Sequence, residues 1–152
     1  MDAENDRIEQ QIDIDAPAER VWDLVAVPGW YVNDGAYEEH RIERVGDVDL
    51  VHDRVHGVFA FRTVALERPR YAAFRWIADH ESSDPDTEST LVEFWIDERP
   101  GGVTLRVVES GFASLGGTED DRRTRLADNV EGWTIELAVA RDHVESVAAG
   151  RA

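Results

Sequence analysis

The stretch Leu126–Val147, LADNVEGWTIELAVARDHVESV, places apolar residues at steps of three and four. This spacing predicts a long amphipathic α-helix with one apolar stripe. The stripe comprises Leu126, Val130, Trp133, Leu137, Ala140, Val144 and Val147. The charged cluster 119–123 is predicted to open the same helix, because acidic side chains at a helix N-terminus interact favourably with the helix dipole. Such a helix needs an apolar surface to cover its stripe.

Most of the remaining chain alternates apolar and polar residues with the period of two that is typical of half-buried strands. One strand is expected at Ile8–Ile14, and two more, at 91–99 and 103–112, flank the turn residues Pro100-Gly101-Gly102. Between His40 and Ile77, four strands are separated by breaks at Gly46-Asp47, His56-Gly57 and Arg68-Pro69-Arg70. We therefore predict an α+β fold, in which a curved antiparallel sheet of about seven strands wraps around the long C-terminal helix.

Two short helices are predicted after the first strand. Residues 17–27, PAERVWDLVAV, begin with a proline suited to the first helical turn and end before Pro28-Gly29. The buried side of this helix is expected to carry Val21, Trp22, Leu24 and Val25. Residues 29–37 are predicted to form a second short helix or a turn. The stretch 79–90, rich in Ser and Asp, is predicted to be a surface hairpin loop.

Length and composition exclude several classes of protein. The chain has 152 residues, which fits one domain spanning 1–152. Its 33 acidic and 16 basic side chains give a net charge of -17, which disfavours nucleic acid as a partner. All basic residues are arginines and cysteine is absent, so lysine Schiff-base chemistry, disulfides and thiolate nucleophiles are excluded. There is no apolar run of membrane-spanning length, and the polar start MDAENDRIEQ is unlike a signal peptide, so we expect a cytoplasmic protein without membrane insertion.

Four motifs in the right order resemble the START-like or SRPBCC superfamily. They are the segment Ile12–Val25 (IDIDAPAERVWDLV), the Arg68-Pro69 turn before YAAFRW, the segment GGVTLRVVESGF and the pair Gly132-Trp133. Within the superfamily, the chain is most similar to the branch named for the activator of the heat-shock chaperone ATPase. The resemblance implies a helix-grip fold with a deep pocket. It also implies binding of lipids, polyketides or other hydrophobic molecules, which some members cyclise or dehydrate.

Glu109 is the first candidate for chemistry. Val103, Leu105, Val107 and Glu109 alternate along one predicted strand, which places this carboxylate on the inward, apolar face. Burial would raise its pKa towards working pH, so it could contact a ligand or act as a general base. Alternatively, it lies at a wet strand end or forms an ion pair with Arg62 or Arg75.

Arg62 and Arg75 are candidate ligand contacts, since a buried guanidinium can hold a carboxylate through two hydrogen bonds. The alternation of Ala72, Phe74 and Trp76 instead favours a solvent-facing Arg75. Aromatic rings could line a cavity or stack on a flat ligand, although most would serve as ordinary core. The candidates chosen as ligand-binding are Trp30, Tyr31, Trp76, Phe94, Phe112 and Trp133. Trp133 is singled out because Gly132 beside it permits close approach of the sheet or a ligand.

No motif predicts a metal ion or a cofactor. His52 and His56 are four residues apart, but across a strand and a turn their rings should diverge. The sequence also has no G-x-S-x-G elbow and no glycine-rich phosphate loop after a strand. Hydrolase triads and nucleotide sites are therefore not expected.

Three functions remain open. The first is binding of a small hydrophobic ligand between the sheet and the last helix, which predicts a sizeable, mostly apolar pocket. The second is a polyketide cyclase or dehydratase, with Glu109 as base and an arginine stabilising an enolate. The third is a chaperone-regulating interaction module, which predicts a filled core and an exposed apolar patch. A sheet edge or the long helix could also support a homodimer.

Overall fold

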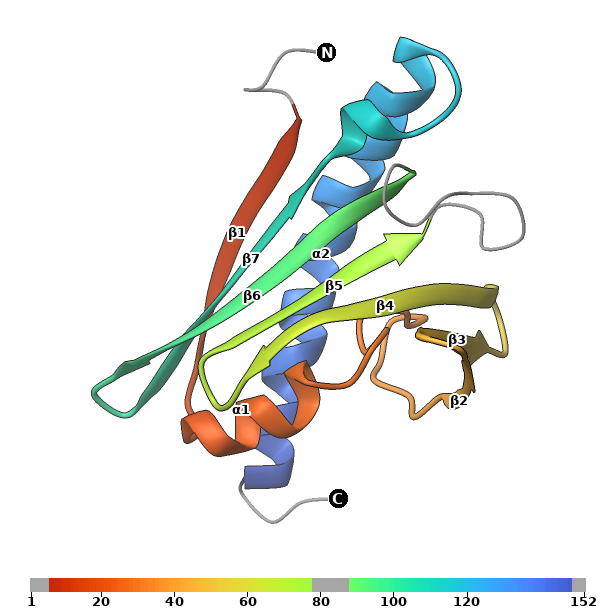
Figure 1. Cartoon of the computed structure of the whole chain (residues 1–152). Coiled ribbons are helices and arrows are strands. Elements are labelled where there is room, and N and C mark those ends of the chain that lie inside the picture. Colours follow the sequence, from red (N-terminus) through yellow and green to blue (C-terminus); the bar gives the residue numbers. More distant parts are fainter. Residues whose placement is uncertain (1–5, 78–87, 149–152) are drawn as a thin grey trace.

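The computed structural model describes residues 6–77 and 88–148. Within these residues, seven strands form one antiparallel sheet in the order β1-β7-β6-β5-β4-β3-β2, and helix α2 lies along one face of it (Figure 1). The strands are β1 Arg7–Ile14, β2 Arg41–Val45, β3 Val48–Asp53, β4 Gly57–Glu67, β5 Tyr71–Ile77, β6 Ser89–Arg99 and β7 Gly102–Ser110. The helices are α1 Ala18–Val25, the short 3-10 helix η2 Phe112–Ser114 and α2 Glu119–Ala148. The predicted α+β architecture is confirmed.

The first and last strands of the chain, β1 and β7, pair at one edge of the sheet. Strand β1 pairs along its full length with β7, and its residues Ile8 and Ile14 are buried on the face towards α2. Position 102 requires glycine, because a Cβ atom there would collide with the carbonyl oxygen of Ile14. The alternating burial along β1 confirms the predicted period of two.

The first helix forms as predicted, and of the two alternatives for residues 29–37 the structure shows the turn. Pro17 precedes α1 in an extended conformation, and all four residues expected on its inner side are buried. Residues 29–37 form turns instead of a helix, with Val32 N–H donating to the carbonyl of Gly29 at 2.9 Å. Gly29 has φ +72, a left-handed conformation that a helix cannot contain, and a Cβ atom there would lie 2.9 Å from Cγ2 of Val51.

Strands β2 to β5 form the predicted meander, with breaks at the expected positions. Between β5 and β6, residues 78–87 lie outside the described part of the chain, so most of the predicted hairpin loop at 79–90 cannot be compared. Ser89 and Thr90, assigned to that loop from sequence, belong instead to strand β6. As part of β6, Thr90 points towards α2.

Helix α2 begins at Glu119, as predicted. Thr118 and Asp121 cap its first turn reciprocally: the Asp121 N–H donates to Thr118 Oγ1, and the Thr118 N–H donates to the Asp121 carboxylate, both at 3.0 Å. Trp133, Leu137, Ala140 and Val144 of the predicted stripe are buried. The predicted stripe is wrong at Val130 and Val147, which are 43% and 45% exposed. No helix in the described residues is both long and apolar enough to cross a membrane.

An aromatic cluster fills the space between the middle of the sheet and α2. The ring centroids of Tyr31 and Trp133 are 4.9 Å apart, and those of Trp30 and Phe94 are 5.3 Å apart. Trp30 and Tyr31 come from the turn segment after α1, so this segment closes the core from the side. Over much of its length, the described helix-grip interior is consequently a packed core.

Candidate functional site

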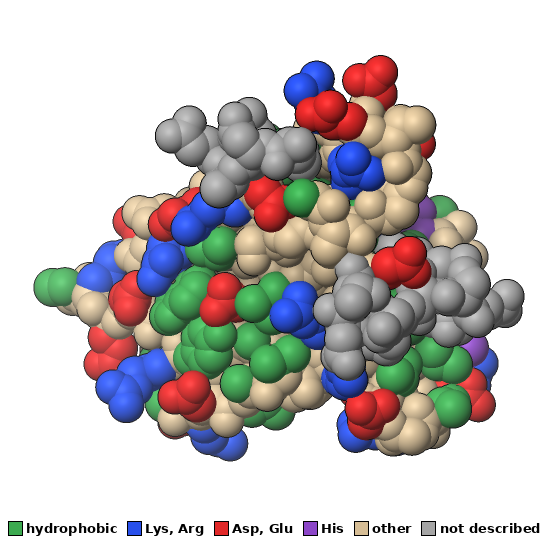
Figure 2. Space-filling model, turned by 45° about the horizontal axis from the view of Figure 1, so that its top comes forward, with side chains coloured by type: hydrophobic (Ala, Val, Ile, Leu, Met, Phe, Trp, Pro, Cys, Tyr) green, Lys and Arg blue, Asp and Glu red, His purple; other side chains and the backbone are tan. Residues whose placement is uncertain are grey.

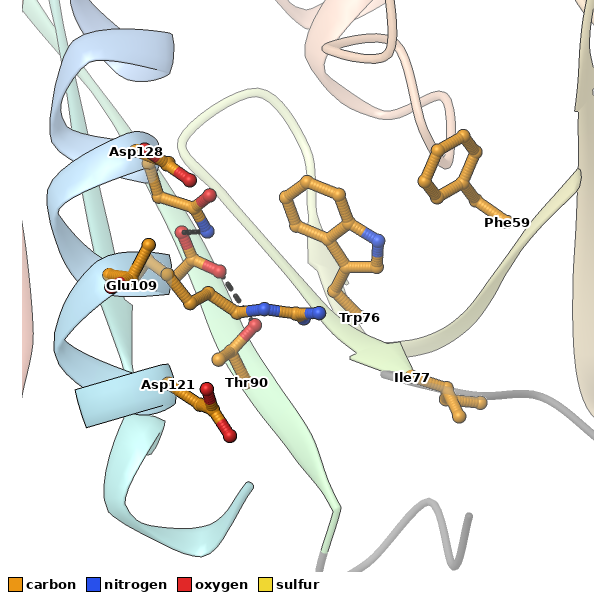
Figure 3. A pocket seen from close by; sticks show the side chains of 10 residues that line it. Phe59, Trp76, Ile77, Thr90, Glu109, Asp121 and Asp128 are labelled. Atoms are coloured by element: carbon orange, nitrogen blue, oxygen red, sulfur yellow. Dashed lines mark hydrogen bonds between the residues drawn. The ribbon is translucent and has the colours of Figure 1, made fainter. Parts of the chain in front are cut away.

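A pocket of about 380 Å³ lies between the sheet and the N-terminal half of α2 (Figure 3). Its sheet side is formed by Phe59 of β4, Trp76 and Ile77 of β5, Thr90 of β6 and Glu109 of β7. Its helix side is formed by Asp121, Thr124, Arg125, Asp128 and Asn129. The pocket therefore has an aromatic wall on the sheet and a charged wall on the helix. The expectation of a mostly apolar pocket is corrected, because every residue of α2 that lines it is polar.

Glu109 lies at the inner end of this pocket and is completely buried. Its strand alternates as predicted, with Val103, Leu105 and Val107 buried on the same face. Three side chains donate hydrogen bonds to its carboxylate: Thr90 Oγ1 to Oε2 at 2.6 Å, and both Asn129 Nδ2 and Trp133 Nε1 to Oε1, at 3.0 and 2.9 Å. The sheet and the helix thus hold one carboxylate jointly.

Burial controls the acidity of this carboxylate. Desolvation raises the pKa of Glu109 above its usual value. The hydrogen bonds from Thr90, Trp133 and Asn129 and the charge of Arg125 lower it in part. Among the described residues, no arginine lies within ion-pair distance of Glu109, so the alternative of a pair with Arg62 or Arg75 is not what the structure shows. A carboxylate in this setting can exchange a proton with a bound molecule near its raised pKa.

A smaller pocket of about 110 Å³ adjoins the first and shares Trp76 and Asn129 with it. Its other lining residues are Tyr31, Gly132, Trp133 and Glu136. Tyr31 is 4% exposed, and its hydroxyl has no hydrogen-bond partner among the described residues. A buried hydroxyl without a partner is uncommon, because desolvating it costs free energy that a hydrogen bond would offset. We call the two adjoining pockets together the Glu109 site.

The aromatic candidates divide into two groups. Tyr31, Trp76 and Trp133 line the Glu109 site, and Trp133 contacts its carboxylate directly. Trp30, Phe94 and Phe112 are at most 1% exposed and line neither pocket of the site, so they act as core. Gly132 lines the smaller pocket, and a Cβ atom there would meet nothing within 4 Å. Its role of permitting close approach to Trp133 is thus not required by packing.

Arg62 and Arg75 do not join the site. They pair across β4 and β5, one residue out of step from the inward pair Phe61 and Trp76. Both therefore lie on the outer face of the sheet, where apolar side chains gather among arginines and carboxylates (Figure 2). Arg62 approaches Asp47 at 3.5 Å there. The ligand role expected for these two arginines is corrected by this placement, and Arg125 is the arginine that lines the pocket.

Several residues of the site were missed from the sequence. Asn129 and Arg125 lie four and eight residues before Trp133 and share its helix face, so the choice of Trp133 already implied these two residues. Asp128 is the chain neighbour of Asn129. Thr90 is two residues from Val92, which pairs with Glu109, so the two side chains share the inward face of the sheet. The sequence did not indicate Thr90, because Ser89 and Thr90 read as loop residues and not as the start of β6. Phe59 had no distinguishing signal beyond its place in an alternating strand.

Among the described residues, no histidine lines either pocket of the Glu109 site. His52 lies on β3 beside Arg41, and His56 lies in the turn before β4. Within residues 6–77 and 88–148, no three His, Asp or Glu side chains converge as metal ligands.

Comparison with known proteins shows the fold. No protein-family model and no curated protein matches the sequence. Among solved structures, protein MLL2253 from Mesorhizobium loti has 19% identity and a TM-score of 0.65, covering 90% of this chain and 94% of its own. The Aha1 dimer from Colwellia psychrerythraea has 17% identity and a TM-score of 0.65, covering 91% and 96%. The Zhui aromatase/cyclase from Streptomyces sp. R1128 has 20% identity and a TM-score of 0.62, covering 96% and 98%.

These likenesses extend over nearly the whole chain. They confirm the predicted helix-grip fold, in which a curved antiparallel sheet wraps around a long C-terminal helix. At 17–20% identity they carry no statement about ligand or activity.

Proposed function

We propose that this protein binds a small hydrophobic molecule, such as a lipid, a polyketide or an aromatic metabolite, in the Glu109 site. The observation that carries the proposal is a fully buried carboxylate, held by three donors, at the inner end of a pocket of about 380 Å³. Burying a carboxylate costs several kcal/mol, which hydrogen bonds from neutral donors offset only in part. A ligand contact gives this otherwise destabilising residue a function.

Two further features support binding. Trp76 and Phe59 present aromatic surface opposite the helix, which suits an apolar or flat molecule (Figure 3). The volume is in the range of small-molecule sites. Two solved structures that share the fold also have names connected with such molecules: the Zhui aromatase/cyclase and DynU16, a protein in the dynemicin biosynthetic locus that has 18% identity and a TM-score of 0.64, over 97% of this chain and 50% of its own.

Native mass spectrometry of the protein purified from its own host tests the proposal, followed by denaturing extraction and identification of any released molecule. The wild type should carry a stoichiometric apolar ligand. Thr124→Trp, which fills the pocket from the helix side, should lose it. Ala127→Trp, on an exposed part of the same helix that does not line the pocket, should keep it. Bare wild-type protein in repeated preparations would contradict the proposal, and a tight protein partner would favour an interaction module.

A second candidate function is cyclisation or dehydration of a polyketide-like ligand. It is favoured by the convergence of Glu109, whose pKa is raised by burial, with Arg125 in one pocket. In this scheme the Glu109 carboxylate removes a proton next to a substrate carbonyl, and the Arg125 guanidinium stabilises the enolate oxygen. Glu109→Gln should abolish turnover of the extracted molecule while retaining its binding. If wild type and variant both return the molecule unchanged, the protein is a carrier.

A further inference from the structure

The Glu109 site has an excess of negative charge with little to balance it. Among the described residues that line its two pockets, Glu109, Asp121, Asp128 and Glu136 are acidic, and only Arg125 is basic. Arg125 is an exposed residue of α2, whereas Glu109 is completely buried. The three hydrogen-bond donors to Glu109 are neutral side chains. The deepest charge of the site therefore has no positive partner in direct contact.

Aromatic rings surround the same space. The ring of Trp76 is in edge contact with Tyr31, with centroids 5.4 Å apart, and lies 6.2 Å from the ring of Phe59. The Trp133 ring is 4.9 Å from that of Tyr31. Aromatic faces attract cations through the ring quadrupole, most strongly where water is excluded. Rings next to a buried carboxylate are the combination that recognises organic cations.

Two acceptor groups remain available beside these rings. The Tyr31 oxygen is buried without a hydrogen-bond partner among the described residues, and it can accept an N–H. Glu136 lies at the far side of the smaller pocket and receives a hydrogen bond from Asn33 Nδ2 at 2.8 Å on Oε1. Burial raises the pKa of Glu136 above its usual value, as it does for Glu109. Both carboxyl groups would gain from a nearby positive charge.

From this arrangement we infer that the ligand of the Glu109 site carries a positive charge: an aromatic or apolar amine whose ammonium group lies between Glu109, Tyr31 and Trp76. The inference rests on the proposed binding function and narrows its ligand class. An anionic ligand would meet four carboxyl groups, and a neutral one would leave the buried Glu109 carboxylate without a counter-charge. The ammonium group would donate to the Glu109 carboxylate and to the Tyr31 oxygen, with its apolar part against Phe59 and Trp76.

Three probes of matched shape test the inference by isothermal titration calorimetry at pH 7: 2-naphthylmethylamine, 2-naphthylmethanol and 2-naphthoate. The amine should bind at least about tenfold more tightly than the alcohol, a difference of about 1.4 kcal/mol in binding free energy. The naphthoate should bind most weakly of the three. Glu109→Gln should remove most of that preference. Glu131→Gln, the same change on an exposed residue of α2 outside both pockets, should keep it and so excludes attraction by net charge alone.

The outcomes separate the two proposals. Equal affinity for amine and alcohol, or preference for naphthoate, would overturn the charge inference and leave ligand binding intact. An amine preference that is lost equally in Glu131→Gln would also overturn it. If none of the three probes binds, both the charge inference and small-molecule binding in this pocket are contradicted. If Glu109→Gln fails to fold, Tyr31→Phe provides the second test, with an expected loss of amine affinity and unchanged alcohol affinity.

Discussion

The two halves of helix α2 face the same sheet in different ways. From Trp133 to Val144, the apolar stripe of the helix is buried in the core, and Trp133 packs against the rings of Trp30 and Phe94. From Asp121 to Asn129, the helix turns polar side chains towards the sheet, and a pocket of about 380 Å³ separates the two layers. Reciprocal hydrogen bonds between Thr118 and Asp121 cap the first turn of this polar half.

One continuous helix thus stabilises the fold through one half and lines a binding pocket with the other. The apolar half contributes more to the free energy of folding than the polar half does, because buried apolar area is the dominant stabilising term. The polar half can then hold a buried carboxylate that costs stability. Substitutions in the two halves should therefore affect different measurements.

The largest effect on stability is expected from Leu137→Ala in the apolar half. Leu137 is 2% exposed in the core, and truncating such a residue costs about 2–5 kcal/mol of unfolding free energy. Urea denaturation followed by tryptophan fluorescence measures the loss. Asp128→Asn in the polar half should change stability by less than about 0.5 kcal/mol. Equal losses for the two variants would remove the proposed division of the helix.

Glu109→Leu should cost about 1–3 kcal/mol, because it leaves the Trp133 and Asn129 donors buried without an acceptor. Glu109→Gln keeps an acceptor oxygen for both donors and should cost less. Thermal unfolding of the two variants measures the contrast. A leucine variant more stable than the glutamine variant would show that the hydrogen-bond network contributes little to folding.

The pH dependence of stability should show the raised pKa of Glu109. Because the folded-state pKa is higher than the unfolded one, the folded state binds more protons between the two values. The associated stability is fully present below the unfolded value of about 4.3 and is lost as pH rises through the folded value. Relative to Glu109→Gln, the wild type should therefore become less stable as pH rises from about 4.3. A difference that is constant between pH 4 and 8 would contradict the effect of burial.

The smallest effect on stability is expected from Tyr31→Phe. The tyrosine hydroxyl has no partner in the described structure, so its removal should change unfolding free energy by less than about 0.5 kcal/mol or increase it. The same variant should bind 2-naphthylmethylamine more weakly than the wild type does. A large loss of stability would indicate that the hydroxyl contributes to the core, and would weaken its assignment to the Glu109 site.

The regular parts of the chain were predictable because their periods are strong. Alternation placed Glu109 on the inner face of β7, and spacing in threes and fours located α2. The segment containing Trp30 and Tyr31 has no period, so its turns and its contribution to the core could not be derived. Arg62 and Arg75 were ambiguous for a related reason: their strands carry apolar residues on both faces, as Ala73 and Phe74 are both buried. Whether rings fill a space or line it depends on packing between distant segments, which no local pattern records.

The most direct test of ligand binding in the Glu109 site is a titration of the 15N-labelled protein with 2-naphthylmethylamine, followed through amide and indole chemical shifts. If the amine binds in the Glu109 site, the chemical shifts should change most at the Trp76 indole, at Glu109 and Thr90, and along residues 121–129 of α2. The signals of Trp30, Leu137 and Val144 should change little. Shifts confined to the outer sheet face around Tyr71 and Trp95, or spread evenly over the apolar half of α2, would contradict binding in this site.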